Sequence, residues 1–176
     1  MSIQKIKLYR VKMLLSVPYH VSYRVYDDFE PIIVEARDSD GRIGWGEGHI
    51  SPGHTFETIN GGWKFCCDAA EKAIGAPVAE AKESILARIS ESPVAASALV
   101  AALEMLNGHR VLNLKSNITL PLLTPFHSNN HGDIPGEVDA RVTEGFRTLK
   151  VKVGKNWEED LAKVCAIQRA AKGKAV

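Results

Sequence analysis

The chain has 176 residues, of which 45% are hydrophobic and 24% are charged. This balance is typical of a globular protein and excludes wholesale disorder. Lys and Arg number 22 and Asp and Glu 21, which leaves a formal net charge of +1 and gives no electrostatic basis for a nucleic-acid or membrane partner. No apolar run approaches the roughly 18–20 residues that span a bilayer, and the N-terminus lacks the apolar stretch of a secretory signal. We therefore expect a soluble cytoplasmic protein.

The three cysteines do not form a disulfide or zinc pattern. Cys66 and Cys67 are adjacent, and Cys165 is distant from both. A disulfide framework normally uses an even number of cysteines, and a zinc site normally uses pairs with C-x2-C-like spacing. We expect all three to be packing residues on helices, because free cysteine behaves as a small buried hydrophobe.

The N-terminal region predicts a small antiparallel β-meander. Apolar side chains mostly alternate over residues 3–14, which predicts a long strand. A loop is expected at 16–28, followed by a β-branched strand at 31–37. Residues 38–41 read DSDG, a hairpin turn, and 43–48 form the return strand.

Three helices follow the meander. The pattern predicts them at 56–74, 78–90 and 93–106. Pro93 suits the first turn of the third helix, and Asn107-Gly108 is a helix stop. A sheet followed by helices indicates an α+β arrangement.

The remaining residues predict alternating strands and helices. The expected elements are a strand at 118–123, a polar loop at 124–136, a helix at 137–144, a strand at 148–154 and a helix after Asn156. Asn156 and Glu159 form a capping box. The apolar stripe expected on the last helix contains Trp157, Leu161, Val164, Cys165 and Gln168.

This alternation is typical of parallel α/β folds. An eight-stranded barrel needs about 200 residues or more, so we expect the chain to stop within a repeating unit, as a fragment or one piece of a larger assembly.

Lys150 and Lys152 are the first candidate for chemistry. Residues two apart on a strand point to the same face, so Val151 and Val153 would face covering helices and the two lysines the other side. Desolvation and a neighbouring ammonium both lower a lysine pKa, which allows a lysine to act as a general base. The alternative is that both lysines are protective charges on an exposed edge strand.

The other polar motifs carry weaker signals. Residues 44–48, GWGEG, lack the third glycine and the helix of a dinucleotide site, so we expect glycines that allow close backbone approach. The histidines are not spaced like metal ligands beside a carboxylate. Four residues remain candidates for a substrate pocket, namely Tyr19, His20, His49 and His54.

Four motifs together resemble the enolase superfamily. Residues 40–47, DGRIGWGE, are similar to its DGxxGWGE hairpin, and Glu57-Thr58 to the ET that opens its first helix. The alanine-rich segment 95–106 resembles its AAxSAxxxALxDL helix. Residues 145–154, GFRTLKVKVG, are similar to the second barrel strand of the muconate lactonizing enzyme and mandelate racemase groups.

The resemblance implies an α+β capping domain over residues 1–112, followed at 113–176 by the first βα units of an incomplete TIM barrel. It implies a metal-dependent enzyme that abstracts the proton α to the carboxylate of a small substrate, normally with Mg²⁺. Lys152 would be the general base, with Lys150 beside it. The implied substrate-binding residues are Tyr19, His20, His49, His54 and Thr124.

The resemblance leaves the reaction open among isomerases (racemase, epimerase or cycloisomerase) and lyases (acid dehydratase). The family's metal ligands lie on later barrel strands, so no magnesium ligand is assigned in this chain, and we expect the fragment alone to be inactive. The alternatives are a non-catalytic binding or assembly module and one half of a two-chain barrel. The family is often oligomeric, which makes a homo-oligomer possible.

Overall fold

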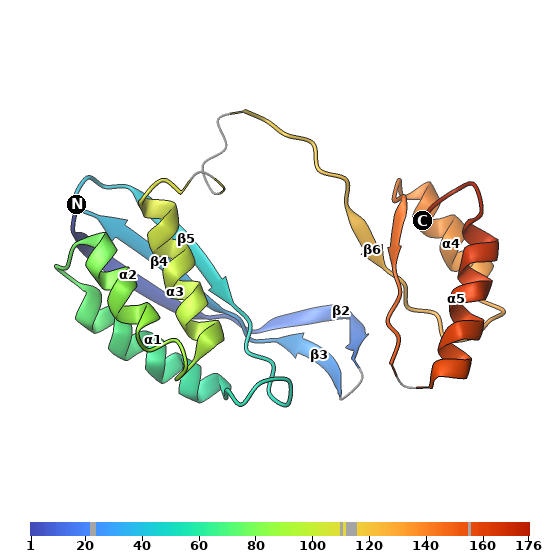
Figure 1. Cartoon of the computed structure of the whole chain (residues 1–176), viewed down its shortest axis with the longest axis horizontal. Helices are drawn as coiled ribbons and strands as arrows, with labels where there is room; N and C mark the ends of the chain where they lie inside the picture. Colours follow the sequence, from blue (N-terminus) through green and yellow to red (C-terminus); the bar gives the residue numbers. More distant parts are fainter. Residues whose placement is uncertain (22–23, 110, 112–115, 155) are drawn as a thin grey trace. The chain divides into compact units, whose positions relative to one another are not determined.

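A computed structural model describes all residues except 22–23, 110, 112–115 and 155 (Figure 1). The chain divides into two compact units, Met1–Ser116 and Asn117–Val176. The boundary expected between residues 112 and 113 lies outside the described residues. No helix in the described part of the chain is long and apolar enough to cross a membrane.

The first unit is built on a three-stranded antiparallel sheet. Its strands are β1 (Ile3–Arg10), β4 (Ile32–Asp38) and β5 (Ile43–Gly48), in the order β1-β4-β5. The turn between β4 and β5 is closed by Asp38, whose carboxylate accepts the backbone N–H groups of Asp40 and Arg42 at 3.0 and 2.9 Å. Gly41 has a φ of 83°, as this turn requires. The antiparallel sheet and the DSDG turn predicted from the sequence are therefore present in the structure.

A second pair of strands replaces most of the expected loop at 16–28. β2 (Met13–His20) and β3 (Val25–Phe29) form an antiparallel hairpin, so residues 3–14 are not one strand. The register shifts between Leu14 and Tyr19. Pro18, which made the segment resemble a loop, lies within this interruption, where no ladder hydrogen bond is lost.

Three helices cover one face of the sheet (Figure 1). They are α1 (Ile59–Ala73), α2 (Val78–Leu86) and α3 (Pro93–Leu106). α3 has the expected bounds, whereas α1 and α2 are shorter than expected. The core between helices and sheet includes Ile3, Val34, Ile50, Phe65, Cys66, Leu99 and Leu103.

Alternate glycines let β5 lie directly against α3. A Cβ atom at Gly44 would lie 2.0 Å from the Ala102 carbonyl oxygen, and one at Gly46 would lie 1.9 Å from that of Ala98. The GWGEG segment is therefore a site of close backbone approach, as the sequence predicted.

The second unit contains two parallel strands and two helices. The elements are β6 (Leu123–Pro125), α4 (Ile134–Thr143), β7 (Thr148–Lys150) and α5 (Trp157–Ala171). The strand expected at 118–123 starts only at Leu123, and the one expected at 148–154 ends at Lys150. Val176 continues the parallel pattern beyond β7, because its N–H donates to Arg147 O at 2.9 Å and its carbonyl accepts from Leu149 N at 2.8 Å.

The buried face of α5 differs from the expected stripe. Asn156 caps the helix by accepting the Glu158 N–H at 3.1 Å, as expected. Trp157 and Leu161 are exposed, however, and the residues that pack into the unit's core are Ile167 and Ala171. The expected stripe lies on a different face, because the apolar residues of α5 occur all round its axis and give no single dominant apolar direction.

Two of the three cysteines also depart from the expectation. Cys66 is buried in α1, but Cys67 and Cys165 are exposed. Adjacent helical residues are about 100° apart around the axis, so Cys66 and Cys67 cannot both face the core.

Candidate functional site

The strand β7 separates two lysines from the helices of its unit. Leu149 and Val151 pack against the core formed with α4 and α5, whereas Lys150 and Lys152 are exposed. Val153, expected on the helix side, is 61% exposed because the regular strand ends at Lys150. The alternation on β7 places Lys150 on the face opposite the covering helices, and Lys152 follows it beyond the end of the strand.

β7 is not the exposed edge strand on which Lys150 and Lys152 would be protective charges. Its one edge pairs in parallel with β6, in the register Thr124↔Leu149 and Pro125↔Lys150. Its other edge hydrogen-bonds with Val176. A strand with backbone partners on both sides needs no protective charges against edge-to-edge pairing. Protection of an exposed strand edge therefore does not explain the lysine on β7.

Thr124 lies on the opposite face from Lys150. Partners in a parallel ladder project to the same side of a sheet, and Thr124 is paired with Leu149. Thr124 is only 5% exposed, in keeping with the helix-packed face. Within this unit the structure therefore does not bring the Thr124 side chain to the side of the lysines.

The loop after β6 is held at the end of that strand by both helices. Phe126 N–H donates to Lys150 O at 3.0 Å, which places the loop beside the lysine strand. Glu137 accepts the N–H groups of His127 and Ser128 at 3.0 and 2.7 Å. Burial would raise the pKa of Glu137, but the donors of Ser128 and His127 outweigh it and the pKa is lowered. The sequence analysis missed this anchoring role, whose only signal is an acidic residue in the first turn of α4.

Lys163 fixes the same loop from α5. Its ammonium donates to Asn129 Oδ1 at 2.9 Å and lies 5.9 Å from the centroid of the Phe126 ring. The side chain is 9% exposed. His131, like His127, lies in the segment between β6 and α4 and is exposed.

Two of the predicted substrate residues in the first unit meet around Phe29. The Tyr19 and Phe29 ring centroids are 6.0 Å apart, and those of Phe29 and His49 are 4.4 Å apart. Tyr26 lies 5.5 Å from Phe29 and 6.1 Å from His49. Phe29 and Tyr26 were not identified from the sequence, because the hairpin that carries them was expected to be a loop.

His20 and His54 lie outside this aromatic cluster. His20 is exposed at the end of β2, where it pairs with Val25. His54 is exposed in a turn, where its N–H donates to Ser51 O at 3.0 Å.

The His49 imidazole is enclosed without a hydrogen-bond partner in the described part of the chain. Both ring nitrogens are buried. Burial lowers the pKa of His49 below 6.5, and the negative charge of Glu47 opposes that shift only in part. The ring is therefore held in the neutral form near pH 7.

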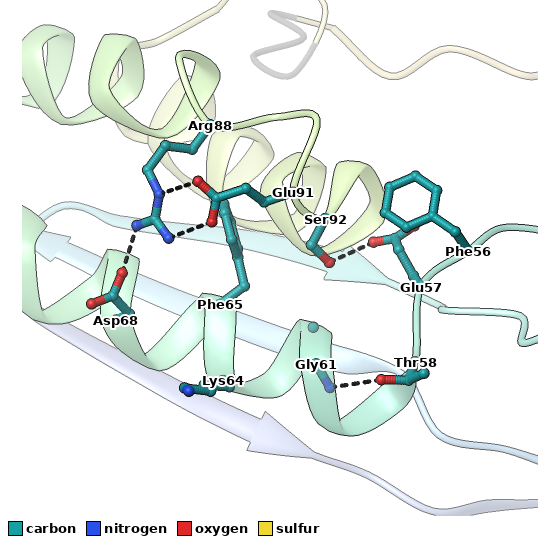
Figure 2. A pocket seen from close by; sticks show the side chains of 11 residues that line it. Phe56, Glu57, Thr58, Gly61, Lys64, Phe65, Asp68, Arg88, Glu91 and Ser92 are labelled. Carbon is teal, nitrogen blue, oxygen red and sulfur yellow. Dashed lines mark hydrogen bonds and ion pairs between the residues drawn. The ribbon is translucent and has the colours of Figure 1, made fainter.

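A cavity of about 510 Å³ lies between α1 and the segment before α3 (Figure 2). Arg88 donates to both Glu91 oxygens at 2.8 and 2.7 Å and also to Asp68. Ser92 Oγ donates to Glu57 at 2.6 Å. These groups satisfy one another, and Lys64 is a further charged residue in the lining.

The Glu57-Thr58 pair has a structural role beside this cavity. Glu57 also accepts the Val94 N–H at 3.0 Å, which satisfies a donor at the start of α3. Thr58 Oγ1 accepts the Gly61 N–H at 3.0 Å and caps α1. The motif thus ties two helix N-termini together.

The described residues do not fit a magnesium site. Within that part of the chain, no three His, Cys, Asp or Glu side chains gather closely enough to hold a metal ion.

Comparisons with known proteins show what this chain is similar to. No protein-family model matches the chain. The chain is 27% identical over 180 residues to a hydrophobic dipeptide epimerase from Citrifermentans bemidjiense, with 92% of this chain and 48% of the relative covered. It is 25% identical over 173 residues to an o-succinylbenzoate synthase from Geobacillus stearothermophilus, with 91% and 46% covered.

A solved structure shows the same fold. A dipeptide epimerase from Enterococcus faecalis V583, in complex with Mg and the dipeptide L-Leu-L-Tyr, matches with a TM-score of 0.84 at 24% identity, covering 99% of this chain and 52% of that one. The expected architecture, a capping domain followed by part of a barrel, is therefore confirmed. The resemblance to the enolase superfamily that the sequence predicted is confirmed, and the chain spans about half the length of the relatives it matches.

Proposed function

We propose that the chain is the N-terminal part of an enzyme that removes the proton α to the carboxylate of a small substrate. The single observation that carries the proposal is the alternation on and after β7. Leu149 and Val151 pack toward the helices, whereas Lys150, on a strand with parallel backbone partners, and Lys152, two residues later, are exposed. In a barrel, the side opposite the helices is the interior.

Lys152 is the general base in this proposal. Its neutral amine takes the α proton, and the electron pair left on carbon is delocalised into the substrate carboxylate as an enediolate. Lys150, two residues away, helps to hold the substrate carboxylate by a charge-assisted hydrogen bond. Return of a proton to the opposite face of that carbon gives the epimer, and the acid that donates this proton would lie outside the described residues.

A dipeptide or another N-acylated amino acid is the substrate class we favour. The support is that more than nine-tenths of the chain is similar to dipeptide epimerases, at 27% identity to one of them and with a TM-score of 0.84 to the structure of another. Cycloisomerisation and dehydration begin with the same proton abstraction and are the alternative reactions.

The E. faecalis epimerase binds Mg, and a bound divalent cation stabilises negative charge that develops on a carboxylate. The described residues of this chain do not gather a ligand set for it. No step assigned to Lys150 or Lys152 depends on such a site, and ligands for a cation would have to come from outside the described residues.

The test uses protein made from the complete coding sequence, incubated with a panel of dipeptides and Mg²⁺ in deuterated water. Exchange of the α proton is followed by NMR. Lys152→Ala is expected to slow exchange by about 10²–10⁴-fold, and Lys172→Ala, an exposed lysine of the same unit, is expected to leave it unchanged. Unchanged exchange in the folded Lys152→Ala variant would remove Lys152 from its role.

A binding module or one half of a two-chain barrel is the second candidate. The observation that favours it is a group of exposed apolar side chains in the second unit, since large exposed apolar patches mark interaction surfaces. They include Leu120, Leu122 and Leu123, which are 66%, 70% and 51% exposed. A stop codon directly after Val176, together with co-purification of a second polypeptide, would favour this candidate over a single-chain enzyme.

A further inference from the structure

The β2–β3 hairpin is the outer half of a ribbon that begins in the three-stranded sheet. Arg10 pairs with Ile32 in the sheet and Met13 pairs with Phe29 in the hairpin. Between them, Val11 N–H donates to Pro31 O at 3.1 Å. The same register runs through all three contacts, so the hairpin is joined to the sheet through one short stretch of backbone, and Figure 1 shows it projecting beyond the sheet.

His49 packs against this outer half from the side. It follows β5 directly, and β5 is fixed against α3 by its glycines. The imidazole packs on Phe29 at 4.4 Å and on Tyr26 at 6.1 Å, both from β3. Both imidazole nitrogens are buried, with no hydrogen-bond partner among the residues described. A neutral ring tolerates this enclosure better than a charged one, because burying an unpaired charge is strongly unfavourable.

We propose that His49 is a pH-sensitive support, which holds the β2–β3 hairpin in place while its imidazole is neutral and releases the hairpin when the imidazole is protonated.

The groups around His49 do not compensate a positive charge fully. From β3, it meets the Tyr26 phenol and the Phe29 ring, and Tyr19 on β2 contacts the other side of Phe29. From β5, Glu47 attracts an imidazolium. Arg24, whose guanidinium lies 4.4 Å from the Tyr26 ring centroid, carries a positive charge on the same hairpin. Ring faces attract cations, yet burial dominates and the pKa of His49 stays below 6.5.

The direction of the pH effect follows from this lowered pKa. In the released state the imidazole is solvated and titrates near its ordinary value of about 6.5. Protons therefore bind preferentially to the released state. The ratio of released to docked hairpin rises by up to about tenfold for each pH unit below that value, and it levels off below the lowered pKa of the docked state. Above about pH 7.5 the ratio is constant.

The hairpin carries Tyr19 and His20, so its release would withdraw two predicted substrate contacts. That consequence rests on the proposed function. The movement itself does not, and it can be measured on the 176-residue chain without any assay of activity.

The experiment measures amide hydrogen exchange by NMR between pH 5 and 8, corrected for intrinsic exchange rates. Protection at Tyr19 and Tyr26 is compared with protection at Val34 in the central strand, and the His49 ring protons are titrated in the same samples. We expect His49 to titrate below pH 6.5 and hairpin protection to fall between pH 7 and 5, by at most about 25-fold, while Val34 stays protected.

Two variants and one control separate His49 from other titrating groups. His49→Phe keeps an aromatic ring that cannot be protonated, and His49→Gln is the second variant should the larger ring disturb packing. Both are expected to abolish the pH dependence of hairpin protection. His54→Phe, at an exposed histidine of the same unit, is expected to retain it.

Three results would overturn the proposal. They are a His49 titration midpoint at or above 6.5, hairpin protection that does not change with pH in the wild type, and an unchanged pH dependence in a folded His49 variant.

Discussion

Replacing Gly46 with alanine tests the packing of β5 on α3. The new Cβ would lie 1.9 Å from the Ala98 carbonyl oxygen and 2.9 Å from the Ala102 amide nitrogen. Both are backbone atoms of one helix, so no side-chain rotation can relieve the clash. The helix and strand must separate locally by about 1 Å before the contact becomes tolerable.

The magnitude follows from what that separation disturbs. α3 contributes fully buried side chains to the core, among them Leu99, Leu103 and Leu106. A gap of 0.5–1 Å loses about a quarter to a half of each dispersion contact across it, and overpacking typically costs about 1–3 kcal/mol. We expect Gly46→Ala to lower the free energy of unfolding by about 3 kcal/mol, a large part of the 5–15 kcal/mol typical of a domain.

The assay is urea unfolding followed by the fluorescence of Trp45 and Trp63, in a Trp157→Phe background that removes the signal of the second unit. Gly41→Ala is the matched control. Its Cβ would meet nothing within 4 Å, but Gly41 has a φ of 83°, which costs an alanine about 1–2 kcal/mol. A Gly46→Ala loss below about 0.5 kcal/mol, or one no larger than that of Gly41→Ala, would refute the close-approach reasoning.

Two further predictions concern buried groups of the first unit. Burial alone would raise the pKa of the Asp38 carboxyl, but the hydrogen bonds donated by Arg42 and Asp40 outweigh burial and lower the pKa below 3.8. The ionised carboxylate therefore stabilises the fold at neutral pH, and this stability is lost as the pH falls through the lowered pKa. Asp38→Asn should lower the free energy of unfolding at pH 7, measured by urea titration, by about 1–3 kcal/mol. The variant should also lose less of this free energy than the wild type between pH 5 and 3. An equally steep loss in the variant would contradict the role of the Asp38 carboxylate. Burial raises the pKa of the Cys66 thiol to about 12, so iodoacetamide at pH 8 should alkylate exposed Cys67 and spare Cys66 in the native protein, as mass spectrometry of peptides would show; equal labelling would mean that α1 opens.

The parts of the fold that the sequence predicted are those governed by local signals. α3 was predicted over its full length because Pro93 and Asn107-Gly108 mark its ends. The cap at Asn156 depends only on its neighbours. The hairpin β2–β3 was missed because Pro18 indicated a loop, and only the non-local pairing with β3 shows that the ladder is interrupted where the proline lies.

The same distinction applies to the candidate site. Successive side chains on a strand point to opposite faces, so the sequence could predict that Lys150 and Val151 lie on different faces. The orientation of Thr124 could not, because it depends on the register between β6 and β7, and a shift of one residue moves every side chain to the other face. Phe29, which joins Tyr19 to His49, was missed together with its strand.

The motif that most resembles the family therefore acts through packing. In GWGEG, Gly46 and its alternate glycine neighbours set the distance between sheet and helix, and the preceding turn is closed by Asp38 and Gly41. Substituting these residues should change stability before it changes chemistry. The glycines permit this approach of strand to helix because a Cβ atom at Gly44 or Gly46 would clash with a backbone carbonyl oxygen of α3. His49 directly follows β5, which lies against α3 through the close approach of its glycines. The position of β5 therefore sets where the imidazole contacts the hairpin. The proposed proton transfer depends on different residues, the lysines of β7, which is why each proposal can fail without the other.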